Sequence, residues 1–326
     1  MKIRIMATES LGVRGLCCTV VLGNRKILID PGIALGWSRH GFLPHPFQIA
    51  VGVELRERIV AEMQDATDVV FSHFHGDHCP LLNPNPYQLG IDRIMHSLNH
   101  CQIWAKNTET CMQVQWKRKD DLSDIPGVAL QNAEGQTVGP LAFSIAVPHG
   151  NTGGTSNTVM MTKITEGSES FVHASDIQLL DDYTVDLIVE WRPDVVLVSG
   201  PPLYHFNSSS FQMQRERAWM NAVRLSEHVE TLIIDHHLLR SEEGMEWLES
   251  LKRAVSHKVL CAAEFMEKPP LLLEAWREDL YRWLPVAEDW HVKYQSGQVD
   301  PEEYRIRGWK LLAKKKNIDK HALFEL

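Results

Sequence analysis

The stretch Phe71-Ser72-His73-Phe74-His75-Gly76-Asp77-His78-Cys79 decides how this sequence is interpreted. It places three histidines and an aspartate within six residues, directly after the apolar run Val69-Val70-Phe71. Neutral imidazoles and carboxylates are good ligands for divalent transition metals, and this density suits two ions held close together. A chance cluster of solvated histidines is the alternative, but the H-x-H-x-D-H order is far more specific than a lone histidine pair.

Three more polar residues follow strand-like segments further along the chain. His149 comes after the apolar segment 143–147, Asp176 after 170–174 and His236 after 231–234. Short apolar segments that end in this way indicate strands, and loops at strand ends are where a rigid scaffold presents chemical groups. We therefore expect these residues to join the histidine motif at one site.

The order of these residues resembles the metallo-β-lactamase superfamily, and Leu28-Ile29-Asp30-Pro31-Gly32 resembles its early aspartate motif. This resemblance runs from Asp30 to about Arg240. A closer resemblance is to a largely archaeal family of uncharacterised proteins within that superfamily. It rests on Thr8–Arg14, Ile27–Gly36, Ala146–Gly150, His173–Leu180, Gly200–Pro202 and Asp235–His237.

The resemblance implies an α/β fold of four layers, an αββα sandwich, with a two-metal centre. One ion would be held by His73, His75 and His149, the second by Asp77, His78 and His236, with Asp176 bridging both. The cofactors expected are therefore two divalent metal ions, zinc in the first place, with manganese or iron as alternatives. A water between two cations loses a proton near neutral pH, which would supply a metal-bridging hydroxide as nucleophile.

Several residues near these ligands have two interpretations each. Asp30 would orient the loop that carries the ligands without binding a metal itself, or it is a plain turn aspartate before Pro31-Gly32. His236 and His237 compete for the ligand position. We prefer His236 as the ligand, because Arg240 lies four residues after it, and we expect His237 to support the ligands without binding a metal. Arg240 could grip a phosphate through two parallel hydrogen bonds, or form an ordinary surface ion pair.

Four other side chains near these segments need an interpretation. Tyr204 and His205 follow Gly200-Pro201-Pro202 and are possible substrate contacts. His173 lies an odd number of residues before Asp176, so an extended strand would turn it away from the metals and into the core. Cys79 adjoins the motif and could be a ligand, but a buried, reduced thiol is the preferred interpretation.

Composition places limits on partners and location. The 326 residues are 44% hydrophobic and 23% charged, with a net charge of −9, which does not favour nucleic acid or an anionic membrane. Lysines between 310 and 320 leave an RNA-contacting tail as the alternative to a solvated helix end. No apolar run approaches a membrane-spanning length, and the first residues alternate like a strand, so we expect a cytoplasmic protein with a small-molecule substrate. The oligomeric state is not predicted.

The pattern along the chain predicts alternating strands and helices. We expect strands over 2–6, 16–22, 26–30 and 68–72, a long loop over 31–52, a helix over 55–66 and another loop over 79–101. Strand-and-turn units follow at 126–147 and 157–174, and then helices at 179–191, 209–228 and 242–255 alternate with strands at 194–199 and 230–235. Two domains are predicted, a catalytic domain over 1–263 and a helical extension over 264–326 packed on it.

The leading functional hypothesis is a dinuclear metal-dependent hydrolase of a small phosphodiester or cyclic phosphoester, with Asp77 and Arg240 as catalytic residues. The first alternative is a hydrolase of a carboxylic ester, thioester or lactone. The second is a metal-binding sensor or interaction protein without turnover. A cation such as Arg240 in the cleft favours phosphate, an apolar cleft favours an ester, and a cleft plugged by the tryptophan-rich C-terminal segment favours the non-catalytic alternative.

Overall fold

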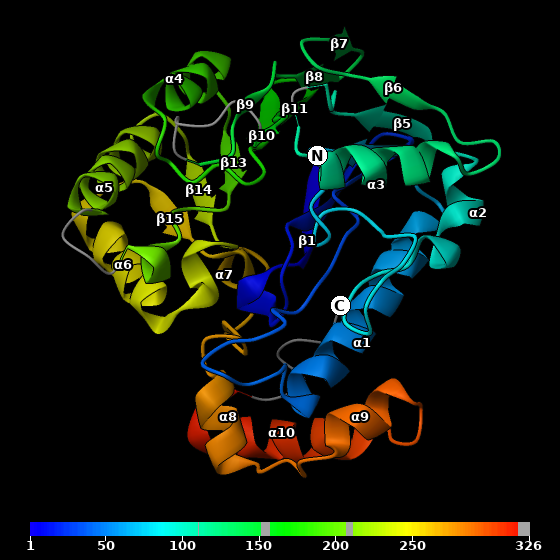
Figure 1. The fold of residues 1–326 in the computed structure, drawn as a ribbon. Helices are drawn as coiled ribbons and strands as arrows, with labels where there is room; N and C mark the ends of the chain where they lie inside the picture. Colours follow the sequence, from blue (N-terminus) through cyan, green and yellow to red (C-terminus); the bar gives the residue numbers. More distant parts are fainter. Residues whose placement is uncertain (110, 151–156, 207–210, 319–326) are drawn as a thin grey trace.

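The computed structural model describes residues 1–109, 111–150, 157–206 and 211–318. Figure 1 shows two sheets at the centre, helices on both outer sides, and a further group of helices across one end. The lysine at position 320, which belongs to the predicted lysine-rich tail, lies outside the described residues.

The first sheet has the order β1-β2-β3-β4-β5-β6 within the described residues. Strands β1 to β3 pair antiparallel, and β3 to β6 pair parallel. All residues of β4 are buried, as expected for a parallel strand covered on both faces. The strands span Lys2–Ala7 (β1), Cys17–Leu22 (β2), Arg25–Ile29 (β3), Asp68–Phe71 (β4), Gln102–Ala105 (β5) and Leu130–Asn132 (β6).

The second sheet has the order β15-β14-β13-β12-β11-β8-β7 in the described part of the chain. Strands β12 to β15 are parallel, so the segments that follow β12, β13 and β14 leave the sheet at the same edge. A separate antiparallel pair joins β9 and β10. The strands span Thr137–Val138 (β7), Leu141–Phe143 (β8), Val147–Pro148 (β9), Thr158–Val159 (β10), Thr162–Glu166 (β11), Glu169–His173 (β12), Val195–Val198 (β13), Thr231–Ile234 (β14) and Lys258–Leu260 (β15).

Helices cover the outer face of each sheet, and the two inner faces pack together (Figure 1). Pro46–Met63 (α1), Met95–Leu98 (α2) and Gln113–Ser123 (α3) lie on the side of the first sheet. Asp182–Trp191 (α4), Gln212–Ser226 (α5) and Glu242–Ala254 (α6) lie on the side of the second sheet. The predicted four-layer αββα sandwich is therefore confirmed.

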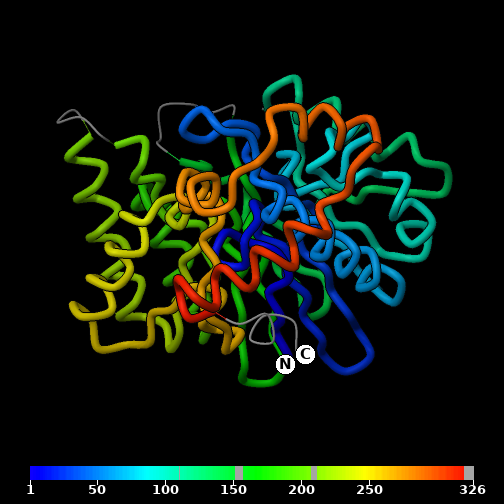
Figure 2. Tube along the Cα trace, turned by 90° about the horizontal axis from the view of Figure 1, so that it is seen from below, coloured from blue at the N-terminus to red at the C-terminus, as the bar shows by residue number. Residues whose placement is uncertain are grey.

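The C-terminal helices cross one end of the sandwich, as Figure 2 shows from below. They are Arg277–Trp283 (α8), Trp290–Gln295 (α9) and Glu302–Lys315 (α10), whereas the short helix Ala262–Phe265 (α7) lies beside the second sheet and contacts β14. Helix α10 packs on α1, where the rings of Phe47 and Trp309 meet edge to face at 5.1 Å. Arg277 is fully buried and donates to the carbonyls of Gly36 and Phe42, which ties the loop before α1 to these helices.

Three stretches differ from the sequence-based expectation. The segment 143–147 is not one strand, because β8 ends at Phe143 and β9 begins at Val147. Helix α1 begins at Pro46, inside the predicted loop 31–52, because the His45 side chain accepts a hydrogen bond from the Phe47 N–H and Pro46 occupies the first helical turn. Strand β5 and helix α3 occupy a region to which the pattern assigned no element, and α2 lies in the predicted loop 79–101. Among the described residues, none of the helices has the length and apolarity that crossing a bilayer requires.

Candidate metal centre

The histidine motif occupies the turn that follows strand β4. Strand β3 is its parallel neighbour, so Asp30 emerges beside the motif and accepts hydrogen bonds from the Ser72 N–H at 2.8 Å and the Ser72 hydroxyl at 2.5 Å. Gly32 then lies against the backbone of the turn, where an added Cβ would sit 2.3 Å from the carbonyl carbon of His78. Only glycine permits this approach, so the Asp30-Pro31-Gly32 stretch shapes the turn that carries the histidines.

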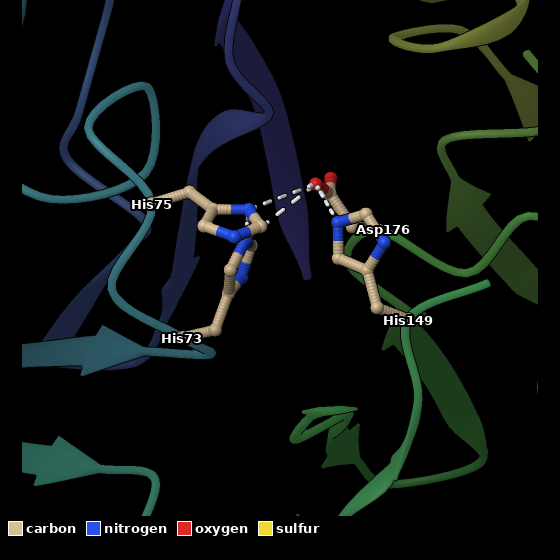
Figure 3. Close-up of side chains that lie close together, drawn as sticks. All are labelled: His73, His75, His149 and Asp176. Carbon is tan, nitrogen blue, oxygen red and sulfur yellow. Dashed lines mark hydrogen bonds and ion pairs between the residues drawn. The ribbon is translucent and has the colours of Figure 1, made fainter. Parts of the chain in front are cut away.

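One group of potential ligands consists of His73, His75, His149 and Asp176, whose ligand atoms lie within 4.8 Å of one another. Figure 3 shows the three imidazoles converging on the carboxylate of Asp176. The Asp176 Oδ2 atom lies 2.9 Å from His149 Nε2, 3.5 Å from His73 Nε2 and 4.0 Å from His75 Nδ1. This arrangement can hold one metal ion.

A second group consists of Asp77, His78 and His236. The Nε2 atoms of His78 and His236 face each other at 3.3 Å, and the Oδ1 atom of Asp176 lies 3.1 Å from the first and 3.4 Å from the second. Asp77 Oδ2 is 3.6 Å from His236 Nε2. A tetrahedral ion with bonds of about 2.05 Å separates its ligands by about 3.3 Å, so these spacings suit one.

Asp176 stands between the two groups. It follows strand β12, and the left-handed backbone of Ser175 (φ 55°) turns the chain toward the site. Its Oδ1 atom is buried and accepts no hydrogen bond from the residues that the structure describes. A buried carboxylate oxygen without a donor is costly unless a cation compensates it. The residues present therefore fit the two-metal centre that the sequence resemblance implies, and Asp176 has the position of a bridge.

Neighbouring side chains hold the ring nitrogens that face away from the centre. Asp30 Oδ2 lies 2.9 Å from His78 Nδ1, and the Ser72 hydroxyl lies 2.9 Å from His73 Nδ1. Three further residues contact outward ring nitrogens and were not predicted from the sequence. These are Glu9 on His236, Gln115 on His75 and Gln178 on His149. The carboxylates and the hydroxyl can accept the outward N–H and so fix the orientation and tautomer of a ligand imidazole, whereas Gln115 and Gln178 present amide nitrogens, which donate.

The site's electrostatics favour a bound cation. Burial lowers the pKa of His73 to about 4 and that of His75 to about 2, so both rings are neutral at pH 7. Burial opposes ionisation of Asp77 and Asp176, but nearby histidines, His78 first, hold the pKa of each carboxyl below its ordinary value. Neutral imidazoles and ionised carboxylates are the forms that bind metals. His78 differs, because its burial is outweighed by Asp176 and Asp30, which raise its pKa well above the ordinary value, so it would release a proton when an ion binds.

Comparisons with known proteins place the chain in a family. A protein of Methanosarcina mazei is 45% identical over 309 residues, which cover 94% of this chain and 100% of that protein. A protein of Pyrococcus furiosus is 32% identical, with 87% of this chain and 93% of that protein covered. Both are named UPF0282 proteins. The chain belongs to the UPF0282 family. No family model matches it.

Solved structures related to this UPF0282 chain are distant. Tm1679, described as a metal-dependent hydrolase of the β-lactamase superfamily, is 14% identical with a TM-score of 0.46, covering 79% of this chain and 95% of that one. Zinc-bound PqqB from Methylobacterium extorquens is 12% identical with a TM-score of 0.46, covering 79% and 98%.

Arg240 of the UPF0282 chain lies beside the second ligand group and not on an open surface. It is 7% exposed, and its Nε donates to Glu9 Oε1 at 2.7 Å. Its Nη2 atom is 3.5 Å from Asp77 Oδ2, and its Nη1 atom donates to the Tyr204 hydroxyl at 3.3 Å. The ordinary surface ion pair considered from the sequence is therefore wrong, because this ion pair is buried.

Tyr204 and His205 belong to a helical turn that follows β13 of this UPF0282 chain, Leu203–His205. The guanidinium of Arg39 lies over the Tyr204 ring at 4.5 Å, and the His205 ring lies 4.3 Å from it. Tyr204 thus joins Arg39 and Arg240 at the edge of the site, whereas His205 is exposed beside it.

His237 also faces Asp176, with its Nε2 atom 3.2 Å from Asp176 Oδ2. It forms a ligand group with Asp176 and His236 but with neither Asp77 nor His73. The Gln178 amide contacts its Nδ1 atom at 3.0 Å, and the same amide nitrogen lies 3.3 Å from His149 Nδ1. The structure thus places His236 with the Asp77 group and His237 beside the bridge.

Two remaining residues of the UPF0282 chain lie away from the ligand atoms. His173 is buried in β12, and its Nε2 atom pairs with the Leu16 carbonyl at 2.8 Å, so the expected core position is confirmed. Cys79 is fully buried, burial raises the pKa of its thiol, and it joins none of the ligand groups among the described residues. The expected buried thiol is confirmed.

Proposed function

We propose that this chain is a dinuclear metal-dependent hydrolase of a small phosphodiester or cyclic phosphoester. One observation carries the proposal: Asp176 belongs to the group of His73, His75 and His149, and its Oδ1 atom also lies 3.1 Å from His78 Nε2 of the second group. The Arg240 guanidinium lies beside that second group, 3.5 Å from Asp77 Oδ2. Two clustered metal positions with an adjacent guanidinium are suited to an anionic substrate whose charge rises in the transition state.

Each residue of the site has a distinct proposed role. His73, His75 and His149 would hold one ion, Asp77, His78 and His236 the other, and Asp176 would bridge them. Two divalent ions, zinc or alternatively manganese or iron, would supply Lewis acidity and an activated water. Arg240 would orient a phosphoryl oxygen through its terminal nitrogens, which do not contact Glu9. In this structure these nitrogens lie 3.3 Å from the Tyr204 hydroxyl and 3.0 Å from His236 Nε2, so a bound ion and substrate would replace these contacts.

The centre is open on one side. The side chain of His75 is 24% exposed and that of Asp77 is 18% exposed, whereas His73, His78 and His236 are fully buried. Solvent therefore reaches one ligand of each group. This supports turnover over the sealed, non-catalytic alternative, in which the C-terminal segment would plug the cleft.

A cavity next to Arg240 supports a small substrate. It has a volume of about 550 Å³ and includes Arg39, Tyr204 and Ser241 in its lining. Small-molecule sites commonly occupy about 300–1,000 Å³. Tyr204 contacts Arg240 and also lines this cavity, which therefore adjoins the Arg240 side of the site. None of the proposed metal ligands lines it, and Glu242 and Glu243 do.

One observation favours the carboxylic ester, thioester or lactone as a second candidate. The charge of Arg240 is matched by Glu9 at 2.7 Å, so the cleft gains less positive field than a free guanidinium would give. A carbonyl substrate needs no such field, because the metals alone can polarise its oxygen.

A paired assay separates the two candidates. The metal-replete protein is offered bis(p-nitrophenyl) phosphate and p-nitrophenyl acetate, with Asp77→Ala as the control that lacks a ligand of the second ion. The proposal expects metal-dependent turnover of the phosphodiester that Asp77→Ala abolishes. Turnover of the ester alone selects the second candidate. Turnover of neither substrate, or equal turnover by the wild type and Asp77→Ala, contradicts a hydrolase of these classes.

A further inference from the structure

The five histidines of the two ligand groups differ in the side chains that contact their outward ring nitrogens. In the first group the outward nitrogens meet uncharged side chains, namely the Ser72 hydroxyl on His73, the Gln115 amide on His75 and the Gln178 amide on His149. In the second group they meet carboxylates, Asp30 on His78 and Glu9 on His236. The two halves of the centre are therefore unlike in charge.

Glu9 is the less expected of these carboxylates. It lies in the helical turn Glu9–Leu11 after β1 and is 2% exposed. Its Oε2 atom is 2.6 Å from His236 Nδ1, and its Oε1 atom accepts from Arg240 Nε at 2.7 Å. One carboxylate thus contacts a ligand imidazole through one oxygen and a guanidinium through the other.

The loop that carries Glu9 is fixed to the strand end that carries His236. Asp235 Oδ1 accepts hydrogen bonds from the Thr8 hydroxyl at 2.8 Å and the Ser10 N–H at 3.0 Å. These residues flank Glu9 on both sides, and Asp235 immediately precedes His236. Hydrogen bonds to Asp235 on both sides of Glu9 therefore fix the position of Glu9 relative to His236.

We propose that Glu9 is a positioning residue for His236 and that, with Asp30, it makes the Asp77–His78–His236 position the tighter of two metal sites. This inference rests on the proposed two-metal function and adds the order in which the ions bind. The first ion supplied to the metal-free protein occupies the Asp77–His78–His236 position, and the second occupies the His73–His75–His149 position.

Two physical effects act in the same direction. A carboxylate that accepts the outward N–H of an imidazole makes the opposite nitrogen a stronger donor and fixes its tautomer. Charge adds to this, because Asp77 belongs to the second group and Asp30 contacts His78, while the charge of Arg240 is paired with Glu9. Asp176 is shared and does not distinguish the groups. A divalent cation is therefore bound more strongly at the second group.

The experiment is a stepwise zinc titration of the metal-free protein against a chromophoric chelator, with the stability of each form followed by thermal melting. The wild type is expected to bind two ions with dissociation constants at least about 10-fold apart. Glu9→Gln keeps the shape but removes the charge, and it should weaken the tighter step by about 10- to 100-fold and leave the weaker step unchanged. His149→Ala should remove the weaker step and keep the tighter one.

The matched control is Gln178→Leu, which removes an uncharged partner from the first group. It should weaken only the looser step. Should Glu9→Gln leave the tighter step unchanged, or weaken the looser step instead, the inference is overturned while the two-metal function stands. Binding of fewer than two ions by the wild type overturns the proposed function and this inference together.

A spectroscopic measurement keeps the test valid if Glu9→Gln does not fold. In the zinc-loaded wild type, histidine-selective ¹⁵N NMR is expected to show His236 protonated at Nδ1, with its proton strongly shifted downfield by the Glu9 hydrogen bond. Glu9→Asp, which retains the charge on a shorter side chain, should move this resonance upfield. An unprotonated Nδ1 in the loaded wild type contradicts the assigned role of Glu9.

Discussion

Asp176 Oδ1 lies 3.1 Å from His78 Nε2, yet this oxygen is buried and accepts no hydrogen bond within the described part of the chain. The other oxygen, Oδ2, lies 2.9 Å from His149 Nε2. Each oxygen of one carboxylate thus faces a different ligand group. Replacing either oxygen by an N–H group would turn a donor toward a position where a cation is expected.

Asp176→Asn is therefore expected to lower the metal content from about two ions per chain to fewer than one. Elemental analysis of the metal-replete variant measures this directly. Asp181→Asn is the control, because Asp181 caps α4 through the Thr184 N–H and asparagine caps equally well. Retention of both ions by Asp176→Asn would exclude Asp176 as the bridge.

Arg240 tests the class of substrate. Arg240→Ala should slow phosphodiester turnover by about 10- to 150-fold, the range of a charge-assisted hydrogen bond of about 1.5–3 kcal/mol, and slow ester turnover much less. Arg240→Lys should restore only part of the loss, because lysine lacks the planar fork. Steady-state kinetics on both substrates measure the difference. Equal losses on both would show that Arg240 acts only through Glu9 and His236.

Helix α10 approaches α1 closely at Gly308. A Cβ at this position would lie 2.3 Å from the ring of Phe47. Gly308→Ala should therefore destabilise the protein by about 1–3 kcal/mol, although alanine is the better helix former. Gly52→Ala in α1 is the matched control, because its Cβ would lie 3.5 Å from Leu35 in ordinary contact. Urea unfolding should show opposite shifts for the two variants.

The burial of His45 leads us to predict a loss of protein stability in acid. Burial lowers its pKa from 6.5 to about 4, although its hydrogen bond to the Leu284 carbonyl partly opposes this, and its Nδ1 atom accepts from the Phe47 N–H. The unfolded chain therefore takes up this proton first, so the loss begins as pH falls below 6.5 and is complete near 4. It amounts to about 2 kcal/mol at pH 5.

Urea unfolding of the wild type and His45→Asn at pH 7 and pH 5 isolates this effect. The stability difference between the two proteins should shift in favour of the variant at pH 5, because asparagine retains the cap without titrating. The other histidines titrate equally in both proteins and cancel. A difference that is the same at both pH values would refute the assignment.

The candidate ligands that the structure brings together were easier to predict from the sequence than the residues that contact them. The motif from His73 to His78 is local, and the later ligands follow strand ends that the resemblance could match. Glu9 lies 227 residues from His236, and no local pattern connects them. One signal was available, because Glu9 follows an alternating strand directly, as the predicted ligands do.

Helices were missed where burial breaks the amphipathic pattern. The first half of α1 is buried throughout, because α10 covers the side that would otherwise face water, so 46–52 has no polar stripe. Helix α3 has the opposite composition, with only Gln115 and Leu122 buried. A helix that is apolar all round or polar nearly all round gives little periodic signal.

The metal content of the purified protein tests the central claim most directly. The protein is loaded with zinc, freed of excess ion by gel filtration, and measured by elemental analysis against its protein concentration. We predict close to two ions per chain, because Asp176 belongs to one ligand group and lies 3.1 Å from His78 Nε2 of the other. A metal-replete sample that holds at most one ion per chain would contradict it.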